Sequence, residues 1–215
     1  VATPPTSEAR VGMLRPDVAL VNGYLKPADL PDSAAILPGP PASGSAAAAA
    51  DQAAFQTAMT VPADRFARAA ADAELRFPAV TESFAAIVGV AIDERSMPHT
   101  AMLLRRTMTD AGLSTYGAKQ RYERTRPFVA NRVPSCTPSD EAMLAKDGSY
   151  PSGHAAIGWM MALVLTDLSP AQATALLQRG FDFGQSRVFC RVHWQSDVEA
   201  GRLMASATFA RLQAD

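Results

Sequence analysis

The chain has 215 residues, which is long enough to bury a hydrophobic core and matches the size of a single domain. Hydrophobic residues make up 48% and charged residues 19%, so the chain is not mostly disordered. The 20 basic and 21 acidic side chains give a net charge of -1, whereas nucleic-acid-binding proteins carry a basic excess. The longest apolar run, residues 155–165, is shorter than the ~20 residues of a membrane-spanning helix, so we expect no membrane insertion.

The first 45 residues are rich in proline and glycine, which interrupt regular elements. We therefore expect an extended N-terminal arm over residues 1–45, packed on a helical domain that spans residues 46–215. No charged-then-apolar leader follows Val1, as expected of a processed mature protein or of a shortened one.

The remainder of the chain shows helical periodicity and almost no strand-like alternation. Prolines and glycines separate the predicted helices, which cover about 46–59, 64–77, 81–93, 100–126 with a break near 112–117, 154–168, 170–186 and 197–212. The predicted helix at 81–93 is apolar on all sides, which predicts that it is buried on every side. Residues 188–194 are the one segment whose pattern fits a strand as well as a helix. The sequence therefore predicts an all-α, single-domain protein.

Three groups of polar residues lie at predicted helix boundaries. In the first, Lys119 and Arg126 are seven residues apart, which is about two helical turns, so they would share one helix face that ends at Pro127. Two such cations are often only a solvated stripe.

The second group is Pro151-Ser152-Gly153-His154, at the start of a strongly apolar helix. The unpaired N–H groups and the positive end of the dipole make a helix N-terminus suitable for an anion, and Gly153 would let an oxyanion approach the backbone. Ser152 could also be an ordinary N-cap, but this alternative does not explain the proton donor His154 beside it.

The third group is Arg187, His193 and Asp197. A carboxylate four residues after a histidine can accept from one ring nitrogen and leave the other free to attack, although structural His–Asp pairs are common. Arg187 is suited to a bidentate grip on phosphate. Together the three groups indicate phosphoryl transfer without a metal, whereas His99 is assigned to structure.

The two cysteines, Cys136 and Cys190, are 54 positions apart and do not have the spacing of a zinc site. They could be unrelated buried thiols in a cytosolic protein. In an oxidising compartment a bridge between them would remove about 4 kcal/mol of unfolded-state entropy in the chain-entropy model.

The order Lys119-x6-Arg126-Pro127, Pro151-Ser152-Gly153-His154 and Ser186-Arg187-x5-His193-x3-Asp197 resembles the three-part signature of the type 2 phosphatidic acid phosphatase (PAP2) superfamily, which includes the vanadium haloperoxidases. No signature position departs from the pattern. The segments 24–33, 37–41, 148–154 and 193–201 further resemble the bacterial class A non-specific acid phosphatases, so the likeness runs from about residue 20 to the end of the chain.

This resemblance implies a role for each matching residue. His193 would be the nucleophile that forms a phosphohistidine, Asp197 would orient it, and His154 would be the acid and then the base. The phosphate oxygens would be held by Lys119, Arg126, Arg187, the Ser152 hydroxyl and the Gly153 N–H. The class is periplasmic after removal of a signal peptide, which favours a Cys136–Cys190 disulfide.

The expected activity is therefore a cofactor-free acid phosphatase that acts on phosphate monoesters, with a bell-shaped pH profile and an acidic optimum. Vanadate is expected to inhibit it, phosphotransfer to other acceptors is compatible with the intermediate, and the resemblance suggests a homodimer. The alternatives are a vanadate-dependent haloperoxidase and a non-catalytic phosphate-binding protein. A membrane lipid phosphatase lacks its spanning helices here, and a serine hydrolase is poorly supported because Tyr150 replaces the first glycine of its motif.

Overall fold

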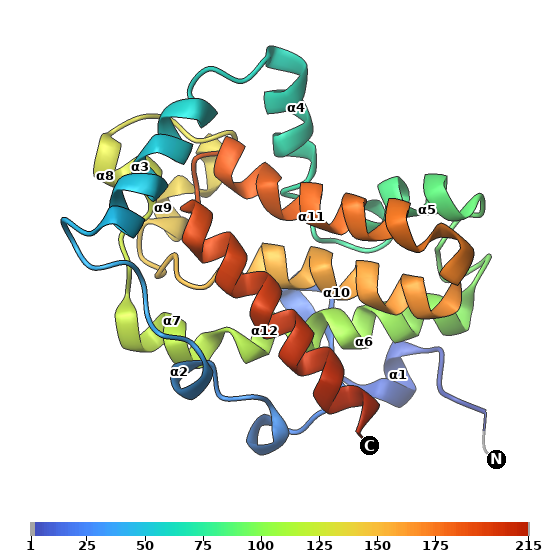
Figure 1. Ribbon diagram of the computed structural model, residues 1–215. Coiled ribbons are helices and arrows are strands. Elements are labelled where there is room, and N and C mark those ends of the chain that lie inside the picture. Colours follow the sequence, from blue (N-terminus) through green and yellow to red (C-terminus); the bar gives the residue numbers. More distant parts are fainter. Residues whose placement is uncertain (1–2, 215) are drawn as a thin grey trace.

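Four long helices form the centre of the computed structural model, which describes residues 3–214 (Figure 1). They are α6 (Pro98–Ser114), α10 (Gly153–Leu168), α11 (Ala173–Phe189) and α12 (Gln195–Gln213). Helix α10 is apolar on nearly every side and packs against the other three. The described residues form a mostly helical single domain, which confirms the predicted all-α class.

Shorter helices surround this centre. They are α3 (Ala46–Ala58), α4 (Ala63–Ala71), α5 (Glu82–Val88), α7 (Tyr116–Tyr122), α8 (Pro127–Asn131) and α9 (Glu141–Leu144), with 3-10 turns at Ala79–Thr81, Pro138–Asp140 and Pro170–Gln172. The prediction that the apolar segment around α5 is buried on every side is wrong. Only Phe84 is fully buried within α5, and Gly89 ends the helix in the left-handed conformation at φ 77°.

The arm contains more regular structure than its prolines suggested. Its elements are α1 (Glu8–Val11), β1 (Met13–Arg15), β2 (Leu20–Val21), α2 (Ser33–Ile36) and 3-10 turns at Pro16–Val18 and Pro27–Asp29. Strands β1 and β2 pair antiparallel, with Met13 opposite Val21. Both 3-10 turns begin with proline, because its fixed φ and missing N–H suit the first position of a turn.

Buried polar contacts tie this arm to α6 and α7. The carboxylate of Asp110, fully buried on α6, accepts from the backbone N–H of Tyr24 at 2.9 Å and of Leu25 at 3.1 Å. The Ser33 hydroxyl oxygen accepts from the N–H of Ala118 at 2.9 Å. The arm therefore buttresses α7, which carries Lys119.

A close helix crossing sets the position of the second polar group. A Cβ at Gly201 would lie 2.3 Å from the carbonyl oxygen of Ser152, so only glycine lets α12 approach the start of α10 this closely. Gly158 on α10 leaves similar room for the ring of Phe183 on α11. These glycines let α11 and α12 carry Arg187 and Asp197 to the N-terminus of α10.

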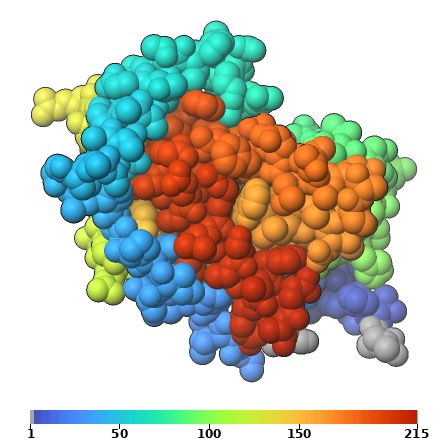
Figure 2. Space-filling model, in the orientation of Figure 1, coloured from blue at the N-terminus to red at the C-terminus, as the bar shows by residue number. Residues whose placement is uncertain are grey.

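The front face of the molecule is formed largely by α11 and α12, with α3 and part of the arm beside α12 (Figure 2). Across residues 3–214, no helix has both the length and the apolar character that a bilayer crossing requires.

Candidate active site

Lys119 and Arg126 do not lie on one helix face, which corrects the expectation from their spacing. Helix α7 ends at Tyr122, and Glu123 turns into the left-handed region at φ 40°. Arg126 is extended, as the residue before proline must be, and Pro127 begins α8 instead of ending a helix. Both cations nevertheless meet at Asp147, whose Oδ2 lies 3.5 Å from Lys119 Nζ and 3.0 Å from Arg126 Nη2.

Arg126 also contacts His193 directly. Its Nη1 lies 3.1 Å from His193 Nε2 and donates to the Val192 carbonyl at 3.0 Å. A guanidinium can only donate, so Nε2 of neutral His193 is the acceptor and Nδ1 carries the proton. Nδ1 lies 3.5 Å from Asp197 Oδ2 without hydrogen-bond geometry, and catalytic contacts of this kind often tighten only when substrate binds.

Asp197 is fully buried in the first turn of α12. Its Oδ2 accepts from the Trp194 N–H at 2.8 Å and its Oδ1 accepts from Arg124 Nη1 at 2.6 Å. The Asp197 carbonyl accepts from the Ser152 N–H at 2.9 Å, which joins the third polar group to the second. Two donors thus hold the carboxylate, and its Oδ2 lies on the side of His193, 3.5 Å from Nδ1.

Ser152 caps α10 as predicted, because its Oγ accepts from the Ala155 N–H at 3.2 Å. Gly153 follows at the first helical position, where a backbone N–H has no partner within the helix. A Cβ at Gly153 would meet only Thr115 Oγ1, at 3.7 Å. Protein packing therefore does not require glycine here, which fits space kept for a ligand.

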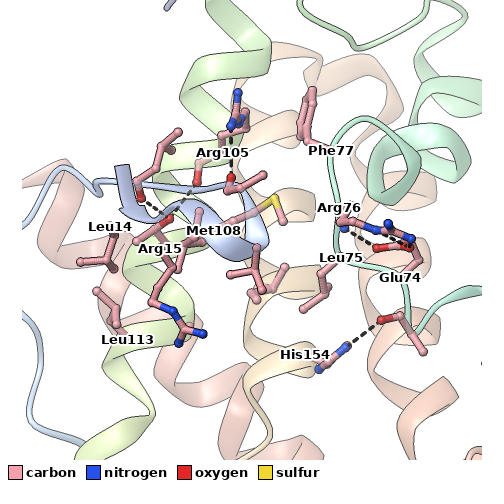
Figure 3. Close-up of a pocket in the computed structure, with 18 of the residues that line it drawn as sticks. Leu14, Arg15, Glu74, Leu75, Arg76, Phe77, Arg105, Met108, Leu113 and His154 are labelled. Carbon is pink, nitrogen blue, oxygen red and sulfur yellow. Dashed lines mark hydrogen bonds and ion pairs between the residues drawn. The ribbon is translucent and has the colours of Figure 1, made fainter. Parts of the chain in front are cut away.

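The ring of His154 is fixed by the segment after α4. Its Nε2 lies 3.1 Å from the Ala73 carbonyl oxygen, which can only accept, so Nε2 carries a proton and Nδ1 is the exchangeable nitrogen. Figure 3 shows His154 turned into a cavity beside Leu75.

Arg187 is a buried cation near the C-terminus of α11. Among the described residues, its Nε and Nη1 have no hydrogen-bond partner. Buried N–H groups without a partner are costly, and an anion bound among these cations would satisfy them. The Arg187 carbonyl accepts from the His193 N–H at 3.3 Å, which places the two residues of the third group side by side.

Burial dominates the protonation of these groups in the unliganded site. It lowers the pKa of Lys119 to about 8 and that of Arg187 to about 9, with Arg126 adding to both effects. Burial also lowers the pKa of His193 and of His154 well below the usual value, reinforced chiefly by Arg126 at His193 and by Arg187 at His154. Both histidines are therefore neutral at pH 7 in the unliganded site.

A cavity of about 760 Å³ opens onto His154 and Arg187. Its wall combines the arm, the segment after α4 and one side of α6, as Figure 3 shows with Leu14, Leu75 and Leu113. The lining is mostly apolar. The cavity therefore leads from the surface to His154 and Arg187, on one side of the cluster formed by Lys119, Arg126 and Arg187.

The disulfide expected from the resemblance is present: Cys136 and Cys190 are bonded, with their Cα atoms 4.7 Å apart. The Cys136 N–H also donates to the Cys190 carbonyl at 3.2 Å. Cys190 directly follows α11, so the bond fixes the loop that leads to His193.

Three residues of this cluster were not predicted from the sequence. Arg124 and Asp147 lie within a few residues of signature positions, so their charges and locations were the available signal. Asp51 had none, since it is an isolated acid in the alanine-rich α3 that contacts Arg124 at 2.7 Å only in the folded chain. Within residues 3–214, no group of three or more His, Cys, Asp or Glu side chains is arranged to hold a metal ion.

Comparison with known proteins identifies the family of the chain. The family model described as PAP2 superfamily matches residues 100–213. The chain is 43% identical over 194 residues to a non-specific acid phosphatase of Providencia stuartii, covering 89% of this chain and 78% of that protein. It is 40% identical over 195 residues to a non-specific acid phosphatase of Salmonella typhimurium, covering 90% and 78%, and 42% identical over 177 residues to an acid phosphatase of Zymomonas mobilis, covering 82% and 67%. The chain therefore belongs to the PAP2 superfamily, among the non-specific acid phosphatases.

Proposed function

We propose that this acid phosphatase hydrolyses phosphate monoesters through a covalent phosphohistidine at His193. The observation that carries the proposal is the orientation of this ring, with Nδ1 toward Asp197 and Nε2 toward Arg126. A nucleophile needs a lone pair beside the groups that hold its substrate, and His193 Nε2 carries one, which accepts from Arg126 until a phosphate takes over that N–H.

In the first step, His193 Nε2 attacks phosphorus and the bond from phosphorus to the leaving oxygen breaks. His154 Nδ1 gives its proton to that oxygen, so an alcohol leaves and a phosphate remains on Nε2. Lys119, Arg126 and Arg187, with the Ser152 hydroxyl and the Gly153 N–H, stabilise the charge on the equatorial oxygens.

In the second step, water attacks phosphorus while His154 Nδ1 accepts its proton, and the bond from phosphorus to Nε2 breaks. Inorganic phosphate takes the proton back from His154 Nδ1 and leaves as the monoanion, which returns both histidines to their neutral starting states. An alcohol that enters in place of water would accept the phosphoryl group, so phosphotransfer follows from the same intermediate.

The proton on His154 arrives with the substrate. Both histidines are neutral in the free site because burial and nearby cations lower their pKa. A phosphate monoester has a second pKa of about 6, so below that pH it binds largely as a monoanion whose proton can pass to His154 Nδ1. This accounts for an acidic optimum without a protonated histidine in the empty enzyme.

The cations supply the charge that a metal ion supplies in other phosphatases, so we propose that catalysis needs no metal or cofactor. Vanadate should inhibit, because its trigonal-bipyramidal adduct with His193 would copy the geometry of phosphoryl transfer. The cavity beside His154 lies on the leaving-group side, and its mostly apolar wall supports acceptance of varied leaving groups.

A periplasmic location is part of the proposal. The Cys136–Cys190 disulfide supports it, because structural disulfides persist in oxidising compartments. Fractionation of the native host, with the enzyme assayed in the periplasmic extract, tests this location. A homodimer stays a prediction, which light scattering on the purified protein tests.

Turnover of p-nitrophenyl phosphate at about pH 5–6 with excess EDTA tests the mechanism. We expect full activity with the chelator, loss of activity in His193→Ala and a strong decrease in His154→Ala. Inhibition by EDTA would overturn the metal-free mechanism, and full activity in His193→Ala would remove the nucleophile. Bromide oxidation by peroxide with vanadate present would favour the haloperoxidase alternative.

A further inference from the structure

Arg124 lies between two buried carboxylates that come from different ends of the chain. Its Nη1 donates to Asp197 Oδ1 at 2.6 Å, and its Nη2 donates to Asp51 Oδ2 at 2.7 Å. Both acids are almost completely buried, and the side chain of Arg124 is only 14% exposed. The three side chains form a continuous ionic chain from α3 to the partner of His193.

Asp51 also fixes the start of α12. Its Oδ1 accepts from the Ser196 N–H at 2.8 Å, and its Oδ2 accepts from the Ser196 hydroxyl at 2.6 Å. The N–H groups in the first turn of a helix lack partners within the helix, so Asp51 caps α12 from outside. The residue it holds directly precedes Asp197.

Trp194 limits the movement of Arg124 on its remaining side. The guanidinium carbon lies 5.3 Å from the centroid of the indole ring, and the indole N–H donates to the Thr125 carbonyl at 2.9 Å. Phe55 on α3 packs against the same indole, with the ring centroids 6.0 Å apart. Arg124 is therefore held by charge at both ends and by an aromatic face.

We propose that Arg124, held by Asp51, is a positioning residue that keeps the Asp197 carboxylate ionised and turned toward His193 Nδ1. This inference rests on the proposed function, because it concerns how the nucleophile is prepared. With Asp197 fixed, the proton of His193 stays on Nδ1 and Nε2 faces the phosphate. Without Arg124, the Asp197 carboxylate could rotate and the ring could adopt the other tautomer.

The charges around Asp197 give the direction of the effect. Burial raises the pKa of Asp197, while Arg124 and the Trp194 N–H oppose that rise. The other titratable groups that act on it are His193, Lys119, Arg126 and Tyr150. Removal of Arg124 should raise the pKa of Asp197 further. As the pH falls, Asp197 would then take up a proton at a higher pH than in wild type, and activity would be lost below that pH.

The test compares Arg124→Gln, Arg124→Lys and Asp51→Asn with wild type. Arg121→Gln is the matched control, because this arginine is exposed on α7, donates to the Ala34 carbonyl at 3.3 Å and lies 5.5 Å from the Tyr122 ring centroid, away from Asp197. For each protein, kcat, KM, the pH profile and the rate of phosphoenzyme formation by rapid quench are measured, with the free energy of unfolding from urea titration.

We expect Arg124→Gln to lower kcat about 10–100-fold with little change in KM, as outer partners of a reactive side chain do. Its acid limb should move up by about one to two pH units. Arg124→Lys should recover part of the lost kcat. Asp51→Asn should lower kcat and raise the acid limb by less than Arg124→Gln does, and Arg121→Gln should match wild type in both.

A loss of stability in Arg124→Gln with an unchanged pH profile would overturn the proposal and leave Arg124 as a structural link. If Arg124→Gln does not fold, the acid limbs of Arg124→Lys and Asp51→Asn are compared with that of wild type instead. If neither variant shifts its acid limb to higher pH, the proposal is rejected. His193→Ala is run in parallel. A phosphoenzyme that persists in that variant contradicts the proposed function itself, whatever the Arg124 variants do.

Discussion

Arg126 Nη1 and His193 Nε2 lie 3.1 Å apart, so the proposed phosphate-binding cation and the proposed nucleophile contact each other in the unliganded site. Arg126 also donates to Asp147 Oδ2 at 3.0 Å. In the proposed mechanism, a phosphate that enters the site takes over these N–H groups and frees the lone pair of Nε2. Substrate binding itself would therefore prepare the nucleophile.

Gly153→Ala should preserve the fold and lower activity. A Cβ at this position meets only Thr115 Oγ1 at 3.7 Å, an ordinary contact, and alanine is a good helix former. A methyl group would instead occupy space next to the bound phosphate and displace it, which we expect to lower kcat/KM about 100-fold. The measurement pairs p-nitrophenyl phosphate kinetics with thermal unfolding. Wild-type kcat/KM in a folded variant would show that no oxyanion approaches this N–H.

Asp147→Asn should strengthen phosphate binding. The Asp147 carboxylate competes with an incoming phosphate for Lys119 and Arg126, and it is half-exposed, so its interaction with each is modest. We expect the dissociation constant of inorganic phosphate to fall about two- to fivefold, measured by isothermal titration calorimetry at pH 6. Weaker binding in the variant would mean that Asp147 orients the cations rather than competing for them.

Lys119→Arg should extend phosphate binding to higher pH. Burial lowers the pKa of Lys119 to about 8, so free enzyme loses this positive charge as the pH rises through that value, whereas an exposed lysine keeps its charge to about 10.4. Phosphate affinity of the wild type should be steady from pH 7 to 8 and then weaken. In Lys119→Arg the break should move above pH 9, because a guanidinium keeps its proton at a higher pH than an ammonium group does. If phosphate affinity weakens at the same pH in both proteins, a group other than Lys119 causes the weakening.

Removal of the disulfide should destabilise the protein and slow no chemical step. Replacing both Cys136 and Cys190 by serine restores about 4 kcal/mol of unfolded-state entropy in the chain-entropy model, or about 8–16 °C in Tm for a chain of this size. Differential scanning calorimetry of the double variant against the oxidised wild type measures this. Equal Tm values would mean that the bond does not limit the unfolded chain.

The residues proposed from the sequence to carry the chemistry stay a prediction, and their backbone setting was only partly predictable. Ser152 caps α10 as its place before an apolar run indicated. The shared helix face of Lys119 and Arg126 was wrong, because a proline is compatible both with the end of one helix and with the start of the next. Here the left-handed Glu123 ends α7 first, and Pro127 begins α8.

Long-range contacts explain what the sequence could not reveal. Asp51 lies 73 positions before Arg124 and 145 before Ser196, and no local pattern links them. The position of α5 was similarly hidden, since an apolar composition indicates burial but not which side of a short helix meets the core. The structure shows which side is buried: the ring centroids of Phe84 and Phe183 lie 6.5 Å apart in the core.

The central claim is the covalent phosphate on His193, and trapping it is the most direct test. Enzyme mixed with radiolabelled phosphate monoester is quenched in alkali within milliseconds, where phosphohistidine survives, and the label is located by peptide mapping. We predict label on the peptide that contains His193, slow release in His154→Ala and no label in His193→Ala. Turnover without label at His193, or label on another residue, would contradict the account.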